Sequence, residues 1–372
     1  TGVQTCALPI YAGGDINQVY ARALQGTGGT IEADIKAGGY INQVMALDGN
    51  TIRGSIDAGG RINSIYSRGG DIDLSDDANW RTDGDRYIRA GDNIGNIQVI
   101  GGDLLGDADG ELDIYAQGRL ANIIVTGGDM DANVEAASHI GQVYAREWRG
   151  TGGTVSGDIE AGGRISQVMS LNGNGLKATI DADGDIGNII SRGGDLDLTQ
   201  DRVSAGGRIN LIQTLNGDIL GSNNGSPDIH VQGGSLNVIQ AINGNIDGLN
   251  VDVNAGGRGR GDLNTISVTR ADRGIVNSRF EADGRLNSVH VAGQYDRGTA
   301  SWTGGDFANS NIDAGTLNRV YVQHGDITED ASDGEDEIHA DSGRFYVFHQ
   351  RDRFLIDEDN DHYFDGLRAY VG

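Results

Sequence analysis

The chain has 372 residues, of which 54 are acidic and 28 basic, so its formal net charge is −26. This balance excludes a nucleic-acid-binding protein, because the arginines are scattered among a larger number of aspartates and form no basic face. Glycine numbers 62 residues and aromatic residues make up only 6%. That composition excludes a mainly helical fold, since each glycine costs a helix interior roughly 1 kcal/mol. No apolar run reaches the roughly 18 residues that a membrane span needs.

The first ten residues, TGVQTCALPI, do not fit the pattern that follows. They contain the only cysteine, Cys6, and one of the two prolines, Pro9. The segment resembles the in-frame translation of a sequencing-library adapter, so we expect residues 1–10 to be an artefact and the true N-terminus, with any signal peptide, to be missing. The remaining chain then has no cysteine, which suits an exported protein that does not depend on disulfides.

From residue 11 to about 340, an Ala-Gly-Gly frame returns about every 25 residues, as in DIKAGGYINQVMALDGN from Asp34 and SIDAGGRINSIYSRGGDIDL from Ser55. Such a period indicates a repeat unit that buries its apolar face only against its neighbours. Within residues 55–74, three short apolar-alternating runs are separated by glycine pairs that favour turns. We therefore predict an all-β fold, a right-handed parallel β-helix (β-solenoid) of about 14 coils.

Two polar columns are expected to run along this solenoid. An asparagine follows the inward Ile or Leu in many frames, which predicts a ladder of stacked amides: Asn17, Asn42, Asn63, Asn210, Asn237, Asn264, Asn287 and Asn318. Aspartates of the Gly-Gly-Asp corners should form a second column: Asp71, Asp103, Asp129, Asp195 and Asp306, with Asp218 and Asp326 in related corners. Stacked carboxylates repel, so we interpret them as local Asx-turn residues; cation bridging is the alternative.

A second level of repetition joins residues 12–74 to residues 136–198. The two segments align without a gap and are identical at 37 of 63 positions. A block of about five coils was therefore duplicated. Block copying suits a scaffold that lengthens more than a catalytic cleft that is built once. Longer excursions around residues 75–87, 105–111, 220–228 and 293–303 are candidate binding loops.

Residues 341–372 depart from the frame, and we expect either a cap on the solenoid or the start of a following domain. Within them, Asp357, Asp359, Asp361 and Asp365 lie at positions 1, 3, 5 and 9 of a stretch that resembles an EF-hand or dockerin-type loop. The resemblance predicts a Ca²⁺ site with these four ligands. His362 stands where such loops have glycine, and Arg368 where they have the bidentate glutamate. The Asp107, Asp109 and Asp113 stretch is a weaker version, and a solvated acidic turn is the alternative for both.

No catalytic constellation emerges from the sequence. Parallel β-helices also carry polysaccharide lyases and hydrolases, which place two or three carboxylates, or carboxylates with Arg or Lys, on adjacent coils. Here acidic residues and arginines alternate everywhere, and the seven histidines occupy unrelated frame positions. Trp80, Trp148 and Trp302 fall in or near the excursions, where they stack on sugar rings or pack the loops.

The repeats of residues 11–340 resemble those of large bacterial surface and secreted β-solenoid proteins, such as adhesin and autotransporter-passenger stalks. The resemblance implies an extracellular or cell-surface location and a non-enzymatic structural or adhesive rod that binds polysaccharide or cell-surface ligands through loops on one face. A carbohydrate-active β-helix enzyme is the second hypothesis, and a self-assembling polymer of the bactofilin type is the third.

Overall fold

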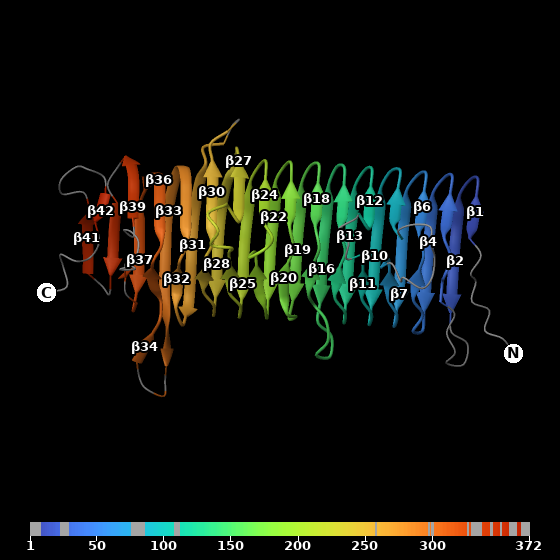
Figure 1. The fold of residues 1–372 in the computed structure, drawn as a ribbon, viewed down its shortest axis with the longest axis horizontal. Coiled ribbons are helices and arrows are strands. Elements are labelled where there is room, and N and C mark those ends of the chain that lie inside the picture. The colour runs from blue at the N-terminus through green and yellow to red at the C-terminus, as the bar shows by residue number, and fades with distance from the viewer. Residues whose placement is uncertain are drawn as a thin grey trace. The chain divides into compact units, whose positions relative to one another are not determined.

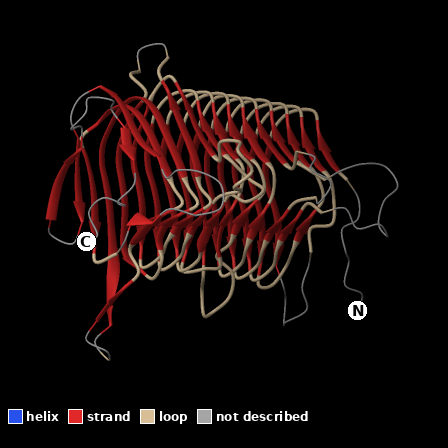
Figure 2. Ribbon diagram, turned by 60° about the vertical axis from the view of Figure 1, so that its left-hand side comes forward, coloured by secondary structure: helices blue, strands red, loops and turns tan. Residues whose placement is uncertain are grey.

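The computed structural model describes residues 9–22, 30–75, 86–107, 112–256, 259–296, 298, 301–325, 327–328, 337–342, 345–349, 352–356 and 363–365. These residues form strands, turns and loops without any helix, and equivalent strands of successive turns pair in parallel (Figures 1 and 2). The predicted all-β parallel β-solenoid is therefore confirmed. The chain forms two compact units, unit 1 (Thr1–Asp183) and unit 2 (Gly184–Gly372).

Each turn of unit 1 contributes up to three strands. The three-residue strands are β1 (Ile10–Ala12), β3 (Ile35–Ala37), β6 (Ile56–Ala58), β9 (Ile88–Ala90), β12 (Ile114–Ala116), β15 (Val134–Ala136), β18 (Ile159–Ala161) and β21 (Ile180–Ala182). The seven-residue strands are β2 (Ile16–Arg22), β4 (Ile41–Leu47), β7 (Ile62–Arg68), β10 (Ile94–Ile100), β13 (Leu120–Thr126), β16 (Ile140–Arg146) and β19 (Ile165–Leu171). The third set is β5 (Ile52–Arg53), β8 (Ile72–Asp73), β11 (Leu104–Leu105), β14 (Met130–Asp131), β17 (Val155–Ser156) and β20 (Gly175–Lys177).

Unit 2 continues the same order. Its strands of the first set are β24 (Val203–Ala205), β27 (Ile229–Gln232), β30 (Asn250–Asn254), β36 (Asn311–Leu317) and β39 (Glu337–Ser342). The long strands are β22 (Ile186–Arg192), β25 (Ile209–Leu215), β28 (Ser235–Ile242), β31 (Asp262–Ala271), β37 (Arg319–Gln323) and β40 (Phe345–His349), and β33 (Arg279–Asp296) runs through both sets. The third set is β23 (Asp195–Asp197), β26 (Ile219–Leu220), β29 (Ile246–Asp247), β32 (Gly274–Val276), β35 (Asp306–Ala308) and β38 (Ile327–Thr328).

The number of turns differs slightly from the 14 expected. The third set contains six described strands in each unit. The last strands pair in the opposite direction. Strand β41 (Asp352–Ile356) pairs antiparallel with β40, and β42 (Tyr363–Asp365) pairs antiparallel with β39. A further antiparallel pair joins the end of β33 to β34 (Ser301–Thr303), and this hairpin stands out from the coil in Figure 1.

The core is a stack of small and medium apolar side chains. Positions 1, 4 and 6 of the long strands point inward, as the buried Ile41, Val44 and Ala46 of β4 illustrate. The next turn places Ile62, Ile65 and Ser67 against them in register. Full burial of one such aliphatic side chain stabilises the fold by about 1.5–3 kcal/mol. Every turn repeats the same inward positions, so the register of each strand is set by the strand of the neighbouring turn.

Glycine is required where successive turns approach closely. A Cβ at Gly157, whose φ is +93°, would lie 2.5 Å from the carbonyl oxygen of Ala132 in the preceding turn. Gly54 has the same role toward Ala33, at φ +145°. The Gly-Gly corners stack as closely, since a Cβ at Gly59 would lie 2.4 Å from the carbonyl oxygen of Gly38, and this explains why glycine recurs there.

Candidate functional site

The Gly-Gly-Asp carboxylates join one turn to the next. Asp71 Oδ1 accepts a hydrogen bond from the backbone N–H of Asp103 at 2.9 Å, and Asp103 Oδ1 accepts one from Asp129 N at 2.8 Å. Asp129 Oδ1 in turn accepts from Thr154 N at 2.8 Å. In unit 2, Asp195 Oδ1 accepts from Asp218 N at 2.8 Å. The column forms as predicted, but its bonds run between turns and not within an Asx turn.

The other two corners use the same device. At the corner before the long strands, Asp15 Oδ1 accepts from Tyr40 N at 3.0 Å and Asp185 Oδ1 from Arg208 N at 2.7 Å. At the corner before the three-residue strands, Asn133 Oδ1 accepts from Asp158 N at 2.9 Å. Each corner therefore pairs backbone N–H groups that would otherwise lack a partner within the turn. Much of the acidic composition is thereby accounted for by the coil itself.

Burial and the neighbouring carboxylates raise the pKa of Asp218. Burial raises the pKa of its carboxyl above the ordinary value, the Asn245 N–H lowers it, and the charges of Asp195 and Asp272 raise it again. Asn245 takes the next corner of the column and has no charge. Its Oδ1 accepts from Arg273 N at 3.0 Å and Gly274 N at 2.9 Å. An amide therefore provides the same acceptor without the repulsion.

The asparagine ladder is present. In unit 2, each Nδ2 donates to the Oδ1 of the preceding turn at 2.7–3.2 Å, through Asn188, Asn210, Asn237, Asn264, Asn287 and Asn318. In unit 1, the same bonds join Asn63 to Asn42 and Asn42 to Asn17. Its amides are bonded to one another from turn to turn, as the sequence predicts.

Two buried aspartates close the excursions. Asp113 is 2% exposed, and its carboxylate accepts from Asp107 N and Asn133 N, both at 2.8 Å. Asp228 is 3% exposed and accepts from Ser222 N, Ser222 Oγ and Asn250 N. Asp113 thus has a structural role within the stretch that was a weaker calcium candidate.

Most of the predicted calcium ligands lie outside the residues that the structure describes. Asp357, Asp359 and Asp361 are not among the described residues, and of Asp365 only the backbone, in β42, is described. No group of three or more His, Cys, Asp or Glu residues suited to a metal ion occurs in the part of the chain that the structure describes. The calcium site stays a prediction.

The outward faces of the strands differ sharply in charge. We define the long-strand face as the outward side chains at positions 3, 5 and 7 of the seven-residue frame. In unit 1 it comprises Gln18, Gln43, Ser64, Asn96, Asn122, Gln142, Gln167, Tyr20, Met45, Tyr66, Gln98, Ile124, Tyr144, Met169, Arg22, Leu47, Arg68, Ile100, Thr126, Arg146 and Leu171. In unit 2 it comprises Asn188, Leu211, Val238, Thr265, Ser288, Arg319, Ile190, Gln213, Gln240, Ser267, His290, Tyr321, Arg192, Leu215, Ile242, Thr269, Ala292 and Gln323.

None of these 39 described positions is acidic, although 54 of the 372 residues are, so random placement would put about six acidic residues there. By contrast, the corresponding outward residues of the first set of strands are often acidic: Asp57, Glu135, Glu160, Asp181, Asp252, Glu281 and Asp313. The long-strand face is therefore free of carboxylates on a strongly acidic protein, and five of its listed positions are arginines: Arg22, Arg68, Arg146, Arg192 and Arg319. In unit 1, two of its arginines, Arg22 and Arg68, form ion pairs with Asp48 at the corner.

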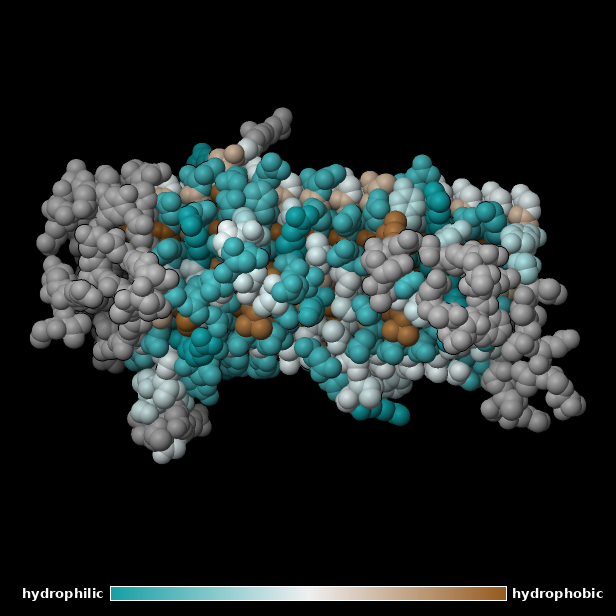
Figure 3. Space-filling view, viewed as in Figure 1, coloured by the Kyte–Doolittle hydropathy of each residue, from teal (hydrophilic) through white to brown (hydrophobic). Residues whose placement is uncertain are grey.

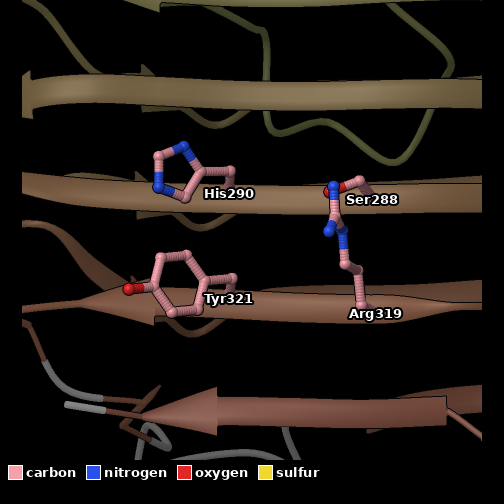
Figure 4. Close-up of a pocket in the computed structure, with 4 residues that line it drawn as sticks. All are labelled: Ser288, His290, Arg319 and Tyr321. Carbon is pink, nitrogen blue, oxygen red and sulfur yellow. The ribbon is translucent and has the colours of Figure 1, made fainter. Parts of the chain in front are cut away.

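The long-strand face of unit 2 contains a groove of about 410 Å³, lined by Ser288 and His290 of β33 and Arg319 and Tyr321 of β37 (Figure 4). The rings of His290 and Tyr321 stack with centroids 5.2 Å apart and planes inclined by 12°. Arg319 Nε donates to Ser288 Oγ at 3.0 Å. Burial lowers the pKa of His290 and the positive charge of Arg319 lowers it further, which favours the neutral imidazole.

The tryptophans of the excursions are accounted for in part. Trp302 stacks on His324 with centroids 3.9 Å apart and contacts Tyr295 at 5.2 Å, so it packs the β33–β34 hairpin. Both tryptophans stay partly exposed, Trp302 at 45% and Trp148 at 46%, and Arg149 lies 5.0 Å above the Trp148 ring. Trp80 lies outside the described residues. Over the surface in Figure 3, hydrophobic residues appear as separate spots within a mainly hydrophilic surface.

Sequence reasoning missed the groove because it treated the histidines as unrelated to the frame. His290 and Tyr321 both occupy position 5, and Ser288 and Arg319 both occupy position 3. An alignment of the two turns by their inward residues places His290 beside Tyr321 and Ser288 beside Arg319. The acid-free columns were visible by the same alignment.

No family model matches the chain, and neither the curated proteins nor the solved structures contain a significant match to it. Within the described residues there is no helix with the length and apolar character to cross a membrane.

Proposed function

We propose that this chain is a non-enzymatic structural or adhesive rod of a cell-surface or secreted protein, and that it binds an extracellular ligand through side chains on the outer surface of the coil and its loops. The observation that carries this proposal is the use of carboxylates as turn-to-turn acceptors at all three corners, by Asp71, Asp185 and Asp34. Those aspartates are committed to backbone N–H groups. Contacts that repeat with each turn are typical of a coil that extends by adding turns, whereas a reaction centre is built at one place.

The test is a screen of the purified chain against plant, algal and host polysaccharides, with detection of new reducing ends and of unsaturated products. We expect no turnover. Robust turnover that a single substitution such as His290→Ala abolishes would overturn the proposal. Labelling of intact cells that express the complete gene tests the location, and we expect the chain to be accessible at the cell surface or released from the cell.

A carbohydrate-active enzyme is the second candidate, and one observation favours it. The groove brings a neutral imidazole, a phenol and a guanidinium into one place. Such groups can accept a proton and stabilise a negative charge. The screen above distinguishes the two candidates, because only the enzyme converts a polysaccharide.

Calcium binding by Asp357, Asp359, Asp361 and Asp365 is a separate part of the proposal. Added Ca²⁺ is expected to raise the midpoint of thermal unfolding, because a ligand that binds only the folded state stabilises it. Asp359→Asn should reduce this increase, and the same concentration of Mg²⁺ serves as the control. An unchanged midpoint over a full Ca²⁺ titration would remove the site.

A further inference from the structure

We infer that the long-strand face of unit 2 is a binding surface for a carboxylated polysaccharide, with the groove of Ser288, His290, Arg319 and Tyr321 as its anchoring point (Figure 4). This inference rests on the proposed adhesive function and names the chemical class of its ligand. It follows from three independent features: the charge of the face, the shape of the ring pair and the donors of Arg319.

The first feature is charge complementarity. A polyanion is repelled by a protein of net charge −26, and the repulsion extends over about a Debye length, roughly 10 Å at 0.1 M salt. A surface that lacks carboxylates over several turns reduces this local repulsion. The long-strand face meets this condition, whereas the face formed by the first set of strands, with its acidic residues, does not.

The second feature is the stacked ring pair. Two nearly parallel rings, inclined by 12°, present a preformed apolar support with little side-chain freedom left to lose. The π-face of an aromatic ring is negative, so it attracts the partly positive C–H groups on one side of a sugar ring. In register with His290 and Tyr321, the preceding turns place Ser267, Gln240 and Gln213 in one column. Gln213 Nε2 donates to Gln240 Oε1 at 2.6 Å, and the remaining donors and acceptors of the column, about 4.8 Å apart from turn to turn, face the hydroxyl groups of a repeating chain.

The third feature is the availability of Arg319. One donor, Nε, is directed to Ser288 Oγ, which fixes the guanidinium next to the groove. Among the described residues no carboxylate is bonded to Arg319, in contrast to Arg53, which Asp73 binds at 2.6 Å, and Arg273, which Asp247 binds at 2.8 Å. The remaining N–H groups of a guanidinium match the two oxygens of a carboxylate. Positions 3 and 5 of a strand are about 7 Å apart, so the rings and the cation lie within reach of one sugar acid.

The test measures binding of the full chain to oligogalacturonate by isothermal titration calorimetry, with a neutral malto-oligosaccharide of equal length as the ligand control. We expect binding of the acidic ligand only, weakened by added NaCl. Arg319→Gln is expected to reduce the affinity by about tenfold or more, because it removes a charged hydrogen-bond donor. Tyr321→Ala is expected to reduce it by several-fold through loss of the ring pair.

Arg89→Gln is the matched protein control. Arg89 is exposed and lies 5.6 Å above the Tyr115 ring, but on the face of the three-residue strands. Its substitution should leave binding unchanged, and hydrogen exchange of β33 and β37 checks that each groove variant keeps its fold. Equal binding of the neutral sugar, or equal losses in the Arg89 and Arg319 variants, would overturn the inference.

Other occupants of the face give different outcomes. Equal binding of poly-glutamate would identify an anionic peptide surface, and self-association that Tyr321→Ala abolishes would identify a second copy of the chain; both results overturn the inference. If no polysaccharide binds but the chain is at the cell surface and converts no substrate, this inference fails and the structural part of the proposed function stands. If a polysaccharide is converted, the proposed function itself fails.

Discussion

At the scale of single residues, the corner acceptors join each turn to the next. A side-chain oxygen bonded to the N–H of the next turn serves equally well as an aspartate or as an asparagine, as Asp218 and Asn245 illustrate. The difference is charge. Where two or more carboxylates follow one another, each additional charge is opposed by burial and by its neighbours.

The substitution Asp218→Asn is therefore expected to stabilise unit 2 at neutral pH, by about 0.5–1 kcal/mol after allowance for solvent screening. The raised pKa means that the ionised carboxylate opposes folding above its folded-state pKa, and that this penalty disappears as pH falls through that value. The gain of the variant should thus shrink on acidification. Urea unfolding at several pH values measures it.

The control for this variant is Asp218→Ala, which also removes the charge but leaves Asn245 N without its acceptor. It is expected to destabilise the unit by about 1–2 kcal/mol. A pH-independent gain in the Asn variant, or a stabilising effect of the Ala variant, would contradict this account of the column.

The sequence predicted the members of this column but not the direction of their bonds. Asp71, Asp103 and Asp129 are each preceded by two glycines typical of a turn, so local Asx chemistry was the simplest interpretation. The inter-turn bond depends on how closely one corner stacks on the next, which the glycine contacts set and the sequence of one corner alone does not contain. The same limit applies to the groove, whose residues are 29–33 positions apart in the chain.

At the scale of elements, the ladder of unit 2 combines the inward apolar set with asparagines at position 2 of the frame in five turns and with Asn188, at position 3, in the first. The ladder of unit 2 depends on consecutive asparagines, so its middle members take part in two bonds and its end members in one. Asn264, for example, donates to Asn237 at 3.0 Å and accepts from Asn287 at 2.7 Å. The repeat of the motif in the sequence was sufficient to predict this element.

Asn264→Ala is expected to lower the free energy of unfolding of unit 2 by about 1 kcal/mol, since two hydrogen bonds are lost. Asn318→Ala removes a single described ladder bond, to Asn287, and should cost about half as much. Chemical denaturation of both variants tests this ratio. Equal losses in the two variants would indicate that the amides act through the local turn and not through the ladder.

At the scale of the whole molecule, the repeat predicts that a complete turn can be removed from unit 1. Deletion of residues 38–58 joins Ala37 to Gly59, and Ala37 and Ala58 are register partners in successive turns. The inward residues of β2, which pair with β4 in the intact chain, can then pair with the equivalent residues of β7 in the same register. We expect hydrogen exchange to show that the amides of β7 remain protected.

A deletion of residues 38–59 is the matched control, because it removes one additional corner residue. A shift of one residue moves every inward side chain of a strand outward, so β7 should lose its protection. Equal protection in both deletions would indicate that the corners, and not the strand register, absorb the change. The C-terminal strands lie beyond this prediction, since β40 and β41 pair antiparallel and follow no repeat.

The hydrogen bonds between corners have a consequence for the folding kinetics of each unit. The corner bonds described here join residues 23–32 positions apart, a separation of one turn. Relative contact order is the mean separation of contacting residues divided by chain length, so it falls as turns are added. Loop-closure entropy per turn stays constant, and a new turn can form on any completed one. A longer version of this chain should therefore extend by sequential addition of turns, with an elongation rate that does not depend on its length.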